Sequence, residues 1–170
     1  GRSCIVTGAA RGIGRAIGEA LLDEGADVLF ADINGDLVAQ VAKANEGRSA
    51  GQVAWAAVDV TNRDQVIAMI DEAVETFGKL DVKFNNAGVN GRGASAFGRI
   101  DPEDLRYAFE VNTFAPILIA EAFVAHVAAS EQKKMAFTSS RLGSIGSKGG
   151  GGGYAYGASK AALNMECKAL

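Results

Sequence analysis

The sequence predicts an α/β fold in which a doubly wound parallel sheet carries helices on both faces. Short apolar runs alternate with segments of helical periodicity, as in strands joined by crossover helices. Polar or glycine-rich residues follow directly after each strand-like run, which is where open α/β sheets bind their ligands. The 170 residues suffice for a single domain, which we expect to span residues 1–170.

Three strands are expected in the first half of the chain, over residues 3–7 (SCIVT), 27–32 (DVLFAD) and 52–60 (QVAWAAVDV). Each is short and apolar, as in a strand that is buried on both faces. Helices are expected over residues 14–25, 34–45 and 63–78. In the last helix, apolar residues recur at helical spacing up to Gly78, a typical helix stop.

The second half continues the same alternation. Residues 80–88 (LDVKFNNAG) predict a strand that runs into a loop, and residues 135–140 (MAFTSS) predict a fifth strand. Between them, residues 102–130 predict one long helix, with Pro116 as the expected position of a kink. A glycine-rich loop then leads into a final helix from about Tyr154.

Composition and charge narrow the classes of partner. Hydrophobic residues make up 48%, charged residues 22%, and the net charge is -3, which gives no reason to expect nucleic acid or a membrane as partner. The apolar stretch 114–129 is interrupted by Glu121 and His126, which favours a buried helix over a membrane span. We expect Cys4 and Cys167 to be free thiols in a reducing, cytoplasmic compartment. His126, the only histidine, lacks a cluster of ligand-spaced residues, so no metal site is expected.

A glycine-rich turn follows the first expected strand. In TGAARGIG, Gly8, Gly12 and Gly14 lie between a strand and a helix. Glycines at such a turn let the backbone approach a pyrophosphate, and the helix N-terminus offers free N–H groups and a positive dipole. Taken alone, the motif is also compatible with an ordinary tight turn.

Acidic residues follow the second and third strands. A carboxylate at Asp32 can accept both hydroxyls of an adenosine ribose and would repel a 2′-phosphate, which favours NAD over NADP. Because Arg11 is present in the glycine turn, NADP is not excluded as a less favoured cofactor. Asp32 is also a candidate helix N-cap, with Asn34 as its rival, and Asp59 is a candidate either for the adenine amino group or for a helix cap.

A tyrosine and a lysine four residues apart open the last helix. Tyr156 and Lys160 would lie on one helical face, whereas Tyr154 would point elsewhere. A phenol is a poor acid or base at neutral pH, but a nearby ammonium stabilises the phenolate and makes proton transfer to or from a substrate oxygen feasible. The pair by itself is equally compatible with a half-buried aromatic beside an exposed lysine.

Taken in order, these motifs resemble the short-chain dehydrogenase/reductase family. The matching segments are TGAARGIG (7–14), Asp32, DVT (59–61), NNAG (85–88), Asn112 in EVN, TSS (138–140) and YGASK (156–160). The first half is similar to polyol and secondary-alcohol dehydrogenases of the family, and the second half to its small carbonyl reductases. The resemblance implies a Rossmann-like domain and hydride transfer between a nicotinamide and a small alcohol or carbonyl compound.

The resemblance also implies a role for each motif. Tyr156 would be the general acid/base, Lys160 would stabilise its phenolate and bind the nicotinamide ribose, and Asn112 would hold a water of the proton relay. A serine would orient the substrate oxygen. The implied cofactor contacts are Gly8, Gly12 and Gly14 at the pyrophosphate, with Arg11 and Ile13 beside them, Asp32 at the adenosine ribose, Asp59 and Val60 at the adenine, and Asn86, Ala87 and Gly88 at the middle of the cofactor. Homodimers or homotetramers would form through the helices 102–130 and from Tyr154.

The sequence departs from the family pattern in four places. The family's serine lies about thirteen residues before its tyrosine, where this chain has Gly143; Ser140, which directly follows a strand, is our choice and Ser144 the second. Five consecutive glycines at 149–153 suggest a flexible loop. Lys83 lies in a strand that should be buried, where the family carries an apolar residue, so either it faces a wet edge or the identity of the residue at this position is in question.

The fourth departure is the end of the chain at Leu170. Family members continue with further strands, a helix and the loop that closes over the substrate, so we expect a fold truncated after the fifth strand and its helix. Substrate contacts are expected mostly in the loop 89–100, the glycine loop and that absent part. Two alternatives therefore stand beside an active enzyme: a cofactor-binding module with little or no turnover, and a structural or regulatory dimer without nicotinamide affinity.

Overall fold

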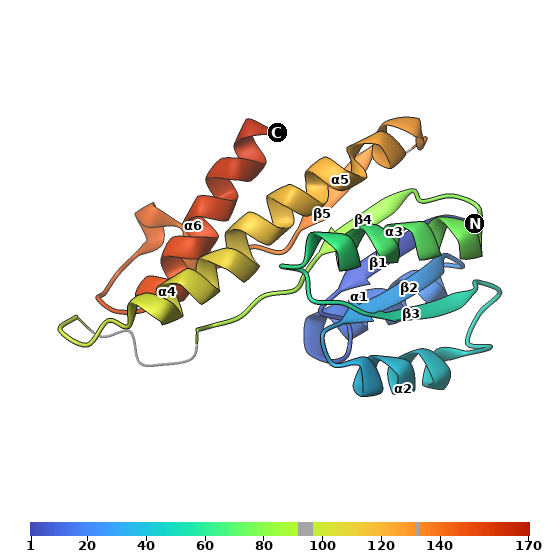
Figure 1. The fold of residues 1–170 in the computed structure, drawn as a ribbon, viewed down its shortest axis with the longest axis horizontal. Helices are drawn as coiled ribbons and strands as arrows, with labels where there is room; N and C mark the ends of the chain where they lie inside the picture. The colour runs from blue at the N-terminus through green and yellow to red at the C-terminus, as the bar shows by residue number, and fades with distance from the viewer. Residues whose placement is uncertain (92–96, 132) are drawn as a thin grey trace.

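A five-stranded parallel sheet forms the centre of the computed structural model, which describes residues 1–91, 97–131 and 133–170. Its strands are β1 (Ser3–Thr7), β2 (Asp27–Asp32), β3 (Val53–Ala57), β4 (Val82–Asn85) and β5 (Lys134–Phe137). They lie in the order β3-β2-β1-β4-β5, and every neighbouring pair is parallel. The order reverses between β1 and β4, which makes their carboxyl ends the switch point of the sheet (Figure 1).

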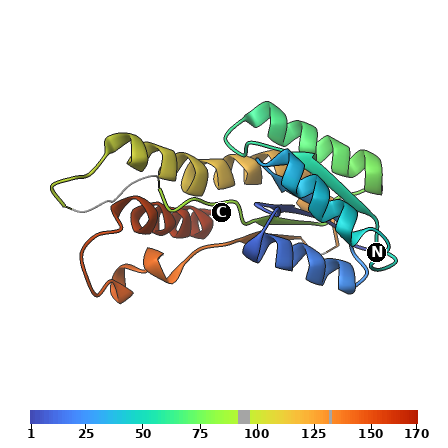
Figure 2. The same ribbon diagram turned by 90° about the horizontal axis from the view of Figure 1, so that it is seen from below.

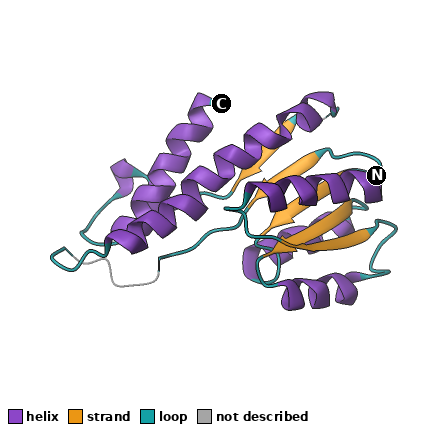
Figure 3. Ribbon diagram, in the orientation of Figure 1, coloured by secondary structure: helices purple, strands orange, loops and turns teal. Residues whose placement is uncertain are grey.

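Helices cover both faces of the sheet, which confirms the predicted fold class (Figures 2 and 3). One face packs against α1 (Gly12–Asp23) and α2 (Gly35–Asn45), around Val6, Val28 and Phe30. The opposite face packs against α3 (Arg63–Phe77) and α5 (Ala115–Ala129), around Ile5 and Leu29. Beyond β5, α4 (Pro102–Phe109) lies beside α6 (Tyr154–Ala169).

Two strands end earlier than the sequence predicts. β3 ends at Ala57 rather than at residue 60, and β5 at Phe137 rather than at 140. β4 ends at Asn85, where the expected segment 80–88 runs into its loop. Residues that follow each of these strands lie along the carboxyl edge of the sheet. These overhanging segments carry the polar motifs, so the discrepancy concerns the candidate site itself.

The long helix predicted over 102–130 is interrupted by a wider turn. Residues Glu110–Phe114 form a π-helix between α4 and α5, and Pro116 follows in the first turn of α5. A proline in a regular helix clashes with the carbonyl four residues earlier and lacks an N–H, and a π-turn relieves both problems. The irregularity at Pro116 is thus a π-turn that precedes it and contains Asn112.

Predicted helix ends are confirmed where capping residues define them. Asp101 accepts a hydrogen bond from the Glu103 backbone N–H at 3.0 Å, with Pro102 at the first position of α4. Gly78 ends α3 at a φ of 77°, which favours glycine. The continuous helical run Pro102–Ala129 is long and apolar enough to cross a membrane, but 50% of its most apolar window is buried inside the fold, as in a core helix.

The expected position of Lys83 at a wet edge is wrong. β4 pairs with β1 and β5, so it is an interior strand, and Lys83 is 0% exposed. Its register neighbours are Ile5 and Met135, both of which belong to the apolar cluster beneath α3 and α5. The Nζ atom has no hydrogen-bond partner among the described residues, and burial lowers the pKa of Lys83 from 10.5 to about 7.

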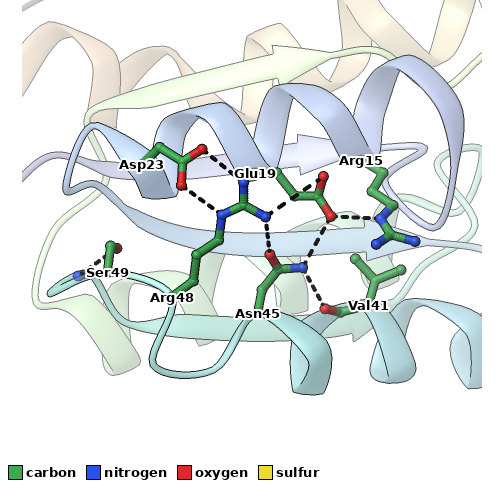
Figure 4. Close-up of polar contacts among 8 residues, drawn as sticks. Arg15, Glu19, Asp23, Val41, Asn45, Arg48 and Ser49 are labelled. Atoms are coloured by element: carbon green, nitrogen blue, oxygen red, sulfur yellow. Dashed lines mark hydrogen bonds and ion pairs between the residues drawn. The ribbon is translucent and has the colours of Figure 1, made fainter.

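A polar network joins α1 to the chain that follows α2 (Figure 4). The guanidinium of Arg48 donates to both carboxylate oxygens of Asp23, at 2.7 and 2.8 Å, and to the amide oxygen of Asn45 at 3.1 Å. The amide nitrogen of Asn45 donates to the Val41 carbonyl and to Glu19. The network lies at the end of the sheet opposite the strand-end motifs and holds two helices of the same layer together.

Candidate active site

A groove of about 570 Å³ runs along the carboxyl ends of the strands. It is lined from the turn after β1, the ends of β2 and β3, the loop after β4, the π-turn, and the beginning of α6. It brings together nearly all residues that the sequence predicts for cofactor binding: Gly8, Arg11, Ile13, Gly14, Asp32, Asp59, Val60, Asn86, Ala87, Gly88, Tyr156 and Lys160. The predicted residues Gly12, Asn112 and Ser140 do not line the groove.

The turn after β1 depends on glycine at two positions. Gly8 has a φ of 66°, and a Cβ there would lie 2.9 Å from the Ala87 Cα. A Cβ on Gly14 would lie 2.2 Å from the Gly8 carbonyl oxygen and 2.4 Å from the Asn86 amide nitrogen. Ordinary side chains are thus excluded because the first turn of α1 is pressed against the strand ends.

The N-terminus of α1 is suited to an anion. Arg11 occupies the N-cap position but makes no side-chain capping hydrogen bond. Next to it, Gly12 has a φ of 57°, and a Cβ there would meet no atom within 4 Å. The free N–H groups of a helix N-terminus and its dipole favour a negatively charged ligand. The turn therefore fits a pyrophosphate group on the chemistry of its donors.

The carboxylate of Asp32 fastens the same turn. One carboxylate oxygen accepts from the Ala10 backbone N–H at 3.0 Å and the other from the Asn34 N–H at 3.0 Å. Asn34 is the N-cap of α2, since its side chain accepts from Leu37 N at 3.0 Å. Asp32 is thus not the helix cap, and it stands half-buried at the edge of the groove with its orientation held from two sides.

Asp59 has a local partner. Its carboxylate accepts from both the backbone N–H and the hydroxyl of Thr61, at 2.9 and 2.7 Å. Asn62, not Asp59, caps α3, accepting from Asp64 N and Gln65 N. The cap alternative for Asp59 is therefore wrong, and the residue shapes the turn that borders the groove.

Asn86 clamps three strand ends together. Its amide nitrogen donates to the carbonyls of Thr7 and Gly8, at 3.1 and 3.3 Å, and its amide oxygen accepts from the Thr138 hydroxyl at 3.2 Å. The Thr7 hydroxyl in turn accepts from the Asn86 and Ala87 N–H groups. The side chain of Asn86 thus holds the ends of β1, β4 and β5 in place, and the backbone of the loop faces the groove.

Tyr156 and Lys160 lie on the groove side of α6. The Lys160 ammonium is 6.0 Å from the centre of the Tyr156 ring and donates to the Thr138 carbonyl at 2.8 Å. Lys160 is buried, and desolvation lowers its pKa from the ordinary value. Tyr154 lies on the opposite side of the helix, in a separate hollow of about 380 Å³ formed with the glycine loop. The structure therefore places the predicted pair, and not Tyr154, at the groove.

Asn112 is fully buried behind the groove wall. Its amide nitrogen donates to the Val89 carbonyl at 2.7 Å and to the Ser159 hydroxyl at 3.0 Å, and its amide oxygen accepts from Val89 N at 2.8 Å. A Cβ on Gly88 would lie 3.1 Å from this oxygen and 3.5 Å from the Lys160 Nζ. Asn112 and Lys160 therefore flank the same glycine.

Neither candidate serine lines the groove. The Ser140 hydroxyl accepts from Leu142 N at 3.2 Å and caps a short 3-10 helix, Arg141–Gly143. Ser144 pairs with Ser147 at 3.0 Å and borders the separate hollow beside Tyr154. Gly143 packs directly on α6, since a Cβ there would lie 2.7 Å from the Lys160 carbonyl carbon. Of the two serines, Ser140 lies closer in sequence to Thr138, which does line the groove.

The structure also shows groove residues that lie outside the matching motifs, namely Ile33, Val58 and Tyr107. Other lining residues lie within the motifs or the expected substrate loop but were given no role of their own: Thr61, Val89, Asn90, Glu110, Val111 and Thr138. Ile33, next to Asp32, is 70% exposed, which is unusual for a large apolar side chain. An isoleucine directly after the polar end of a strand is the sequence signal that could have indicated a ligand contact here. The expected substrate loop 89–100 contains residues 92–96, which lie outside the described residues. Among the described residues, no three potential metal ligands come together.

Comparisons with known proteins show the family of the chain. A family model described as short chain dehydrogenase matches residues 2–170. The 1-deoxy-11-beta-hydroxypentalenate dehydrogenase of Streptomyces exfoliatus is 39% identical over 123 residues, which cover 72% of this chain and 44% of that protein. Momilactone A synthase of Oryza sativa subsp. japonica is 36% identical over 163 residues, which cover 96% of this chain and 57% of that protein. The chain thus spans about half the length of these relatives.

Solved structures show the same fold. A short-chain dehydrogenase from Streptomyces avermitilis superposes with a TM-score of 0.83 at 28% identity, covering 99% of this chain and 59% of that one. An alcohol dehydrogenase from the archaeon Thermococcus sibiricus, solved in complex with 5-hydroxy-NADP, superposes with a TM-score of 0.88 at 23% identity, covering 99% of this chain and 69% of that one. With its parallel sheet, strand-end groove and matching family model, the chain belongs to the short-chain dehydrogenase/reductase family.

Proposed function

We propose that the chain binds NAD(H) in the strand-end groove and belongs to an oxidoreductase that acts on a small alcohol or carbonyl compound. One observation carries the proposal: a single groove joins the glycine turn and Asp32 at one end to Tyr156 and Lys160 at the other. An extended dinucleotide needs an anion site and a ribose site at one end and a proton-transfer group at the other. The groove offers them in that order.

The adenosine end supports NAD over NADP. The carboxylate of Asp32 is held at the groove edge by the Ala10 and Asn34 N–H groups. It would accept the ribose hydroxyls and repel a 2′-phosphate. Arg11, which is exposed and also lines the groove, is the residue that would favour NADP. The solved structure with bound 5-hydroxy-NADP shows that this fold accommodates such a cofactor in another protein.

The other end supports proton transfer by Tyr156. NAD(H), when bound, supplies the acceptor or donor of hydride. The Tyr156 hydroxyl would take the proton from an alcohol oxygen during oxidation and return it to the carbonyl oxygen during reduction. The Lys160 ammonium, held by the Thr138 carbonyl, would stabilise the phenolate formed in between and contact the nicotinamide ribose. Ser140 would orient the substrate oxygen, and Asn112 would hold a relay water behind the groove wall.

The proposal is tested by titrating the 170-residue chain with NADH and, separately, with NADPH, following cofactor fluorescence. Saturable binding with NADH preferred supports the proposed cofactor site. Turnover with NAD is then measured against a panel of secondary alcohols, for the unaltered chain and for Tyr156→Phe. Turnover that is lost in Tyr156→Phe, with NADH affinity retained, supports the catalytic assignment, whereas unchanged turnover contradicts it.

Two other outcomes would point to the alternatives. NADH binding without turnover would support a cofactor-binding module, an alternative that the half-length match to the relatives keeps in view. Absence of binding to either nucleotide would contradict the proposal and favour a structural or regulatory role.

Replacing Asp32 by alanine tests the cofactor preference. The change removes the negative charge at the ribose end, so we expect the ratio of NADH to NADPH affinity to fall by about tenfold or more, as for the loss of one charge-assisted hydrogen bond. The matched control is Asp59→Ala, which removes a carboxylate bonded within its own turn. An unchanged ratio in Asp32→Ala would show that Asp32 only braces the glycine turn.

Assembly and location are part of the proposal. Exposed apolar side chains on the π-turn, α5 and α6, including Phe114, Leu118 and Met165, suit a homodimer or homotetramer. Both cysteines are free thiols, and Cys4 is buried with its pKa raised to about 12 by desolvation. Unreactive free thiols fit a reducing, cytoplasmic compartment without nucleic acid or membrane partners.

A further inference from the structure

Ser159 lies on α6 between Tyr156 and Lys160 and is fully buried. Its hydroxyl donates to the Tyr156 carbonyl at 2.9 Å and accepts from the Asn112 amide nitrogen at 3.0 Å. A serine oxygen can do both, since it keeps acceptor lone pairs after its single proton is donated. Ser159 thus connects the helix that carries the proton-transfer pair to the π-turn that carries Asn112.

The orientation of the Asn112 amide is determined by backbone groups. Val89 N donates to its oxygen at 2.8 Å, and the Val89 carbonyl accepts from its nitrogen at 2.7 Å. If the amide were reversed, its nitrogen would face the Val89 N–H and its oxygen the Val89 carbonyl, and neither contact is a hydrogen bond. The amide nitrogen therefore lies on the side of the Val89 carbonyl and Ser159. Without the Ser159 hydroxyl, one buried amide proton would lose its acceptor, which is unfavourable in a site that excludes water.

The three residues meet next to the groove. Gly88 lies between the Asn112 amide oxygen and the Lys160 Nζ. A Cβ on Gly88 would be 3.1 Å from the first atom and 3.5 Å from the second. A displacement of Asn112 would therefore be transmitted to the wall of the groove at Gly88 and Val89, both of which line it. Ser159 itself does not line the groove.

Resting on the function proposed above, we propose that Ser159 is a positioning residue of the proton relay, which holds Asn112 in register with Tyr156 and Lys160 without touching substrate or cofactor. Its role goes beyond helix packing because its hydroxyl is the acceptor for the one Asn112 amide proton that Val89 does not bind. Ser159 therefore determines the position of the Asn112 side chain relative to Lys160, the residue that follows Ser159 in the chain.

Thr113 provides a matched control. Its hydroxyl donates to the Ser159 carbonyl at 2.9 Å, and the residue is buried. Thr113→Val removes a hydrogen bond between the same two elements, at the same residue, and leaves the amide of Asn112 untouched. Ser159→Ala removes the acceptor of that amide while keeping the size of the side chain almost unchanged.

The first measurement reads the position of Asn112 without turnover. The side-chain amide signals of Asn112 are followed by nuclear magnetic resonance in the full chain with NADH present and are assigned by their loss in Asn112→Ala. In Ser159→Ala we expect one of the two proton signals to move upfield and to exchange with water about tenfold faster, the factor for one lost hydrogen bond. In Thr113→Val we expect both signals to stay in place.

The second measurement concerns the reaction. With NAD and the best secondary alcohol of the panel, Ser159→Ala should lower kcat about tenfold with KM for NAD unchanged, since only the relay is disturbed. Thr113→Val should keep both parameters. Combining Ser159→Ala with Asn112→Ala should lower kcat no further than Asn112→Ala alone, because the two residues act as a unit.

The outcomes separate this proposal from the proposed function. Unchanged Asn112 signals in Ser159→Ala would overturn the proposal whether or not the chain is active. Altered signals with unchanged kcat would also overturn it, since Asn112 would then move without consequence. If the unaltered chain binds NADH but does not turn over, the proposed function fails, and altered signals in Ser159→Ala alone would still support the positioning of Asn112.

Discussion

At the scale of single residues, side chains near the groove are largely occupied in holding the protein together. The side-chain amide of Asn86 is hydrogen-bonded to residues at the ends of neighbouring strands. The carboxylate of Asp32 accepts from Ala10 N and so fixes the glycine turn. A ligand would therefore meet groups that are already oriented, and little conformational entropy would be lost on binding. These residues are held in place because they lie at strand ends, where the backbone is rigid.

Lys83 is the residue whose environment conflicts most with its chemistry. Burial among apolar side chains lowers its pKa from 10.5 to about 7, and its Nζ has no partner in the part of the chain that the structure describes. Between these two pH values the unfolded chain binds more protons than the folded chain, so the free energy of unfolding rises with pH across that window. Below about pH 7 the lysine is charged in both states, and the penalty is constant and at its largest.

We predict that Lys83→Met stabilises the chain. At pH 7 and below, the free energy of unfolding should rise by up to about 5 kcal/mol, since the substitution removes a charge from the apolar core while keeping a long side chain. The gain should shrink as the pH approaches 10. Urea unfolding of both chains at several pH values measures the difference, and parallel pH profiles would show that Lys83 is not desolvated as the structure indicates.

At the scale of elements, the layer formed by α1 and α2 is held together at both ends. The glycine turn and Asp32 fasten the groove end of α1, and the network around Arg48 fastens the opposite end. The Arg48 hydrogen bonds lower the pKa of Asp23, and the carboxylate is exposed. Because that pKa is lowered, the contribution is present above the ordinary pKa of aspartate and is lost as the pH falls through the folded value.

We predict that Arg48→Met lowers the melting temperature by about 2 °C at low salt, because the paired hydrogen bonds to Asp23 are lost. The effect should fade as the pH falls below the ordinary pKa of aspartate and through the lowered pKa of Asp23. The control is Arg63→Met, which removes a single exposed ion pair with Glu121 at 3.3 Å and should have a smaller effect. Thermal melts at two salt concentrations test both, and equal effects would contradict a special role for the network.

The π-turn is the other element with a consequence for the site. It widens the helix at Glu110–Phe114 and places Asn112 where its amide reaches both Val89 and Ser159. A regular helix would rotate the following turns and remove that convergence. The irregularity therefore connects the loop after β4, the helix of the proton-transfer pair and the long apolar helix α5 in one place.

At the scale of the whole molecule, a groove on one edge of the sheet stands beside helices with exposed apolar faces. Phe114 and Leu118, one turn apart, are 46% and 47% exposed, and Met165 on α6 is 69% exposed. Apolar side chains gathered on neighbouring helices are typical of a surface that another subunit covers.

We predict that the 170-residue chain, of 17.5 kDa, assembles through this surface and that Leu118→Glu dissociates it. A charge placed within an apolar interface is desolvated without a partner. Light scattering after size exclusion should give two or four times the chain mass for the unaltered protein and the chain mass for the variant. The control, Ile67→Glu, alters an exposed apolar residue of α3 and should not change the mass; dissociation by both variants would argue against this surface.

Much of the fold and of the groove could be predicted from local patterns. Alternation of apolar runs and helical periodicity determined the order of the elements, and the predicted glycines, Asp32, the NNAG loop, Tyr156 and Lys160 do line one groove, except for Gly12. The ends of β3 and β5 were predicted too late because β-branched residues that fit a strand, Val58, Val60 and Thr138, follow the last paired residues Ala57 and Phe137. The active serine stays a prediction, since the structure places neither Ser140 nor Ser144 in the groove.

The sequence by itself thus determined the class of sheet and the family, and it predicted residues that the structure brings together along one groove, because these depend on spacing along the chain. Only the tertiary structure decided that Lys83 is buried, that Asn34 and not Asp32 caps α2, and that Ser159 meets Asn112. The burial of Lys83 and the Ser159–Asn112 contact depend on groups that are distant in sequence and brought together by packing. The cap of α2 is a local contact between Asn34 and Leu37, but Asp32 was an equal candidate until the structure showed its carboxylate bonded to Ala10 N.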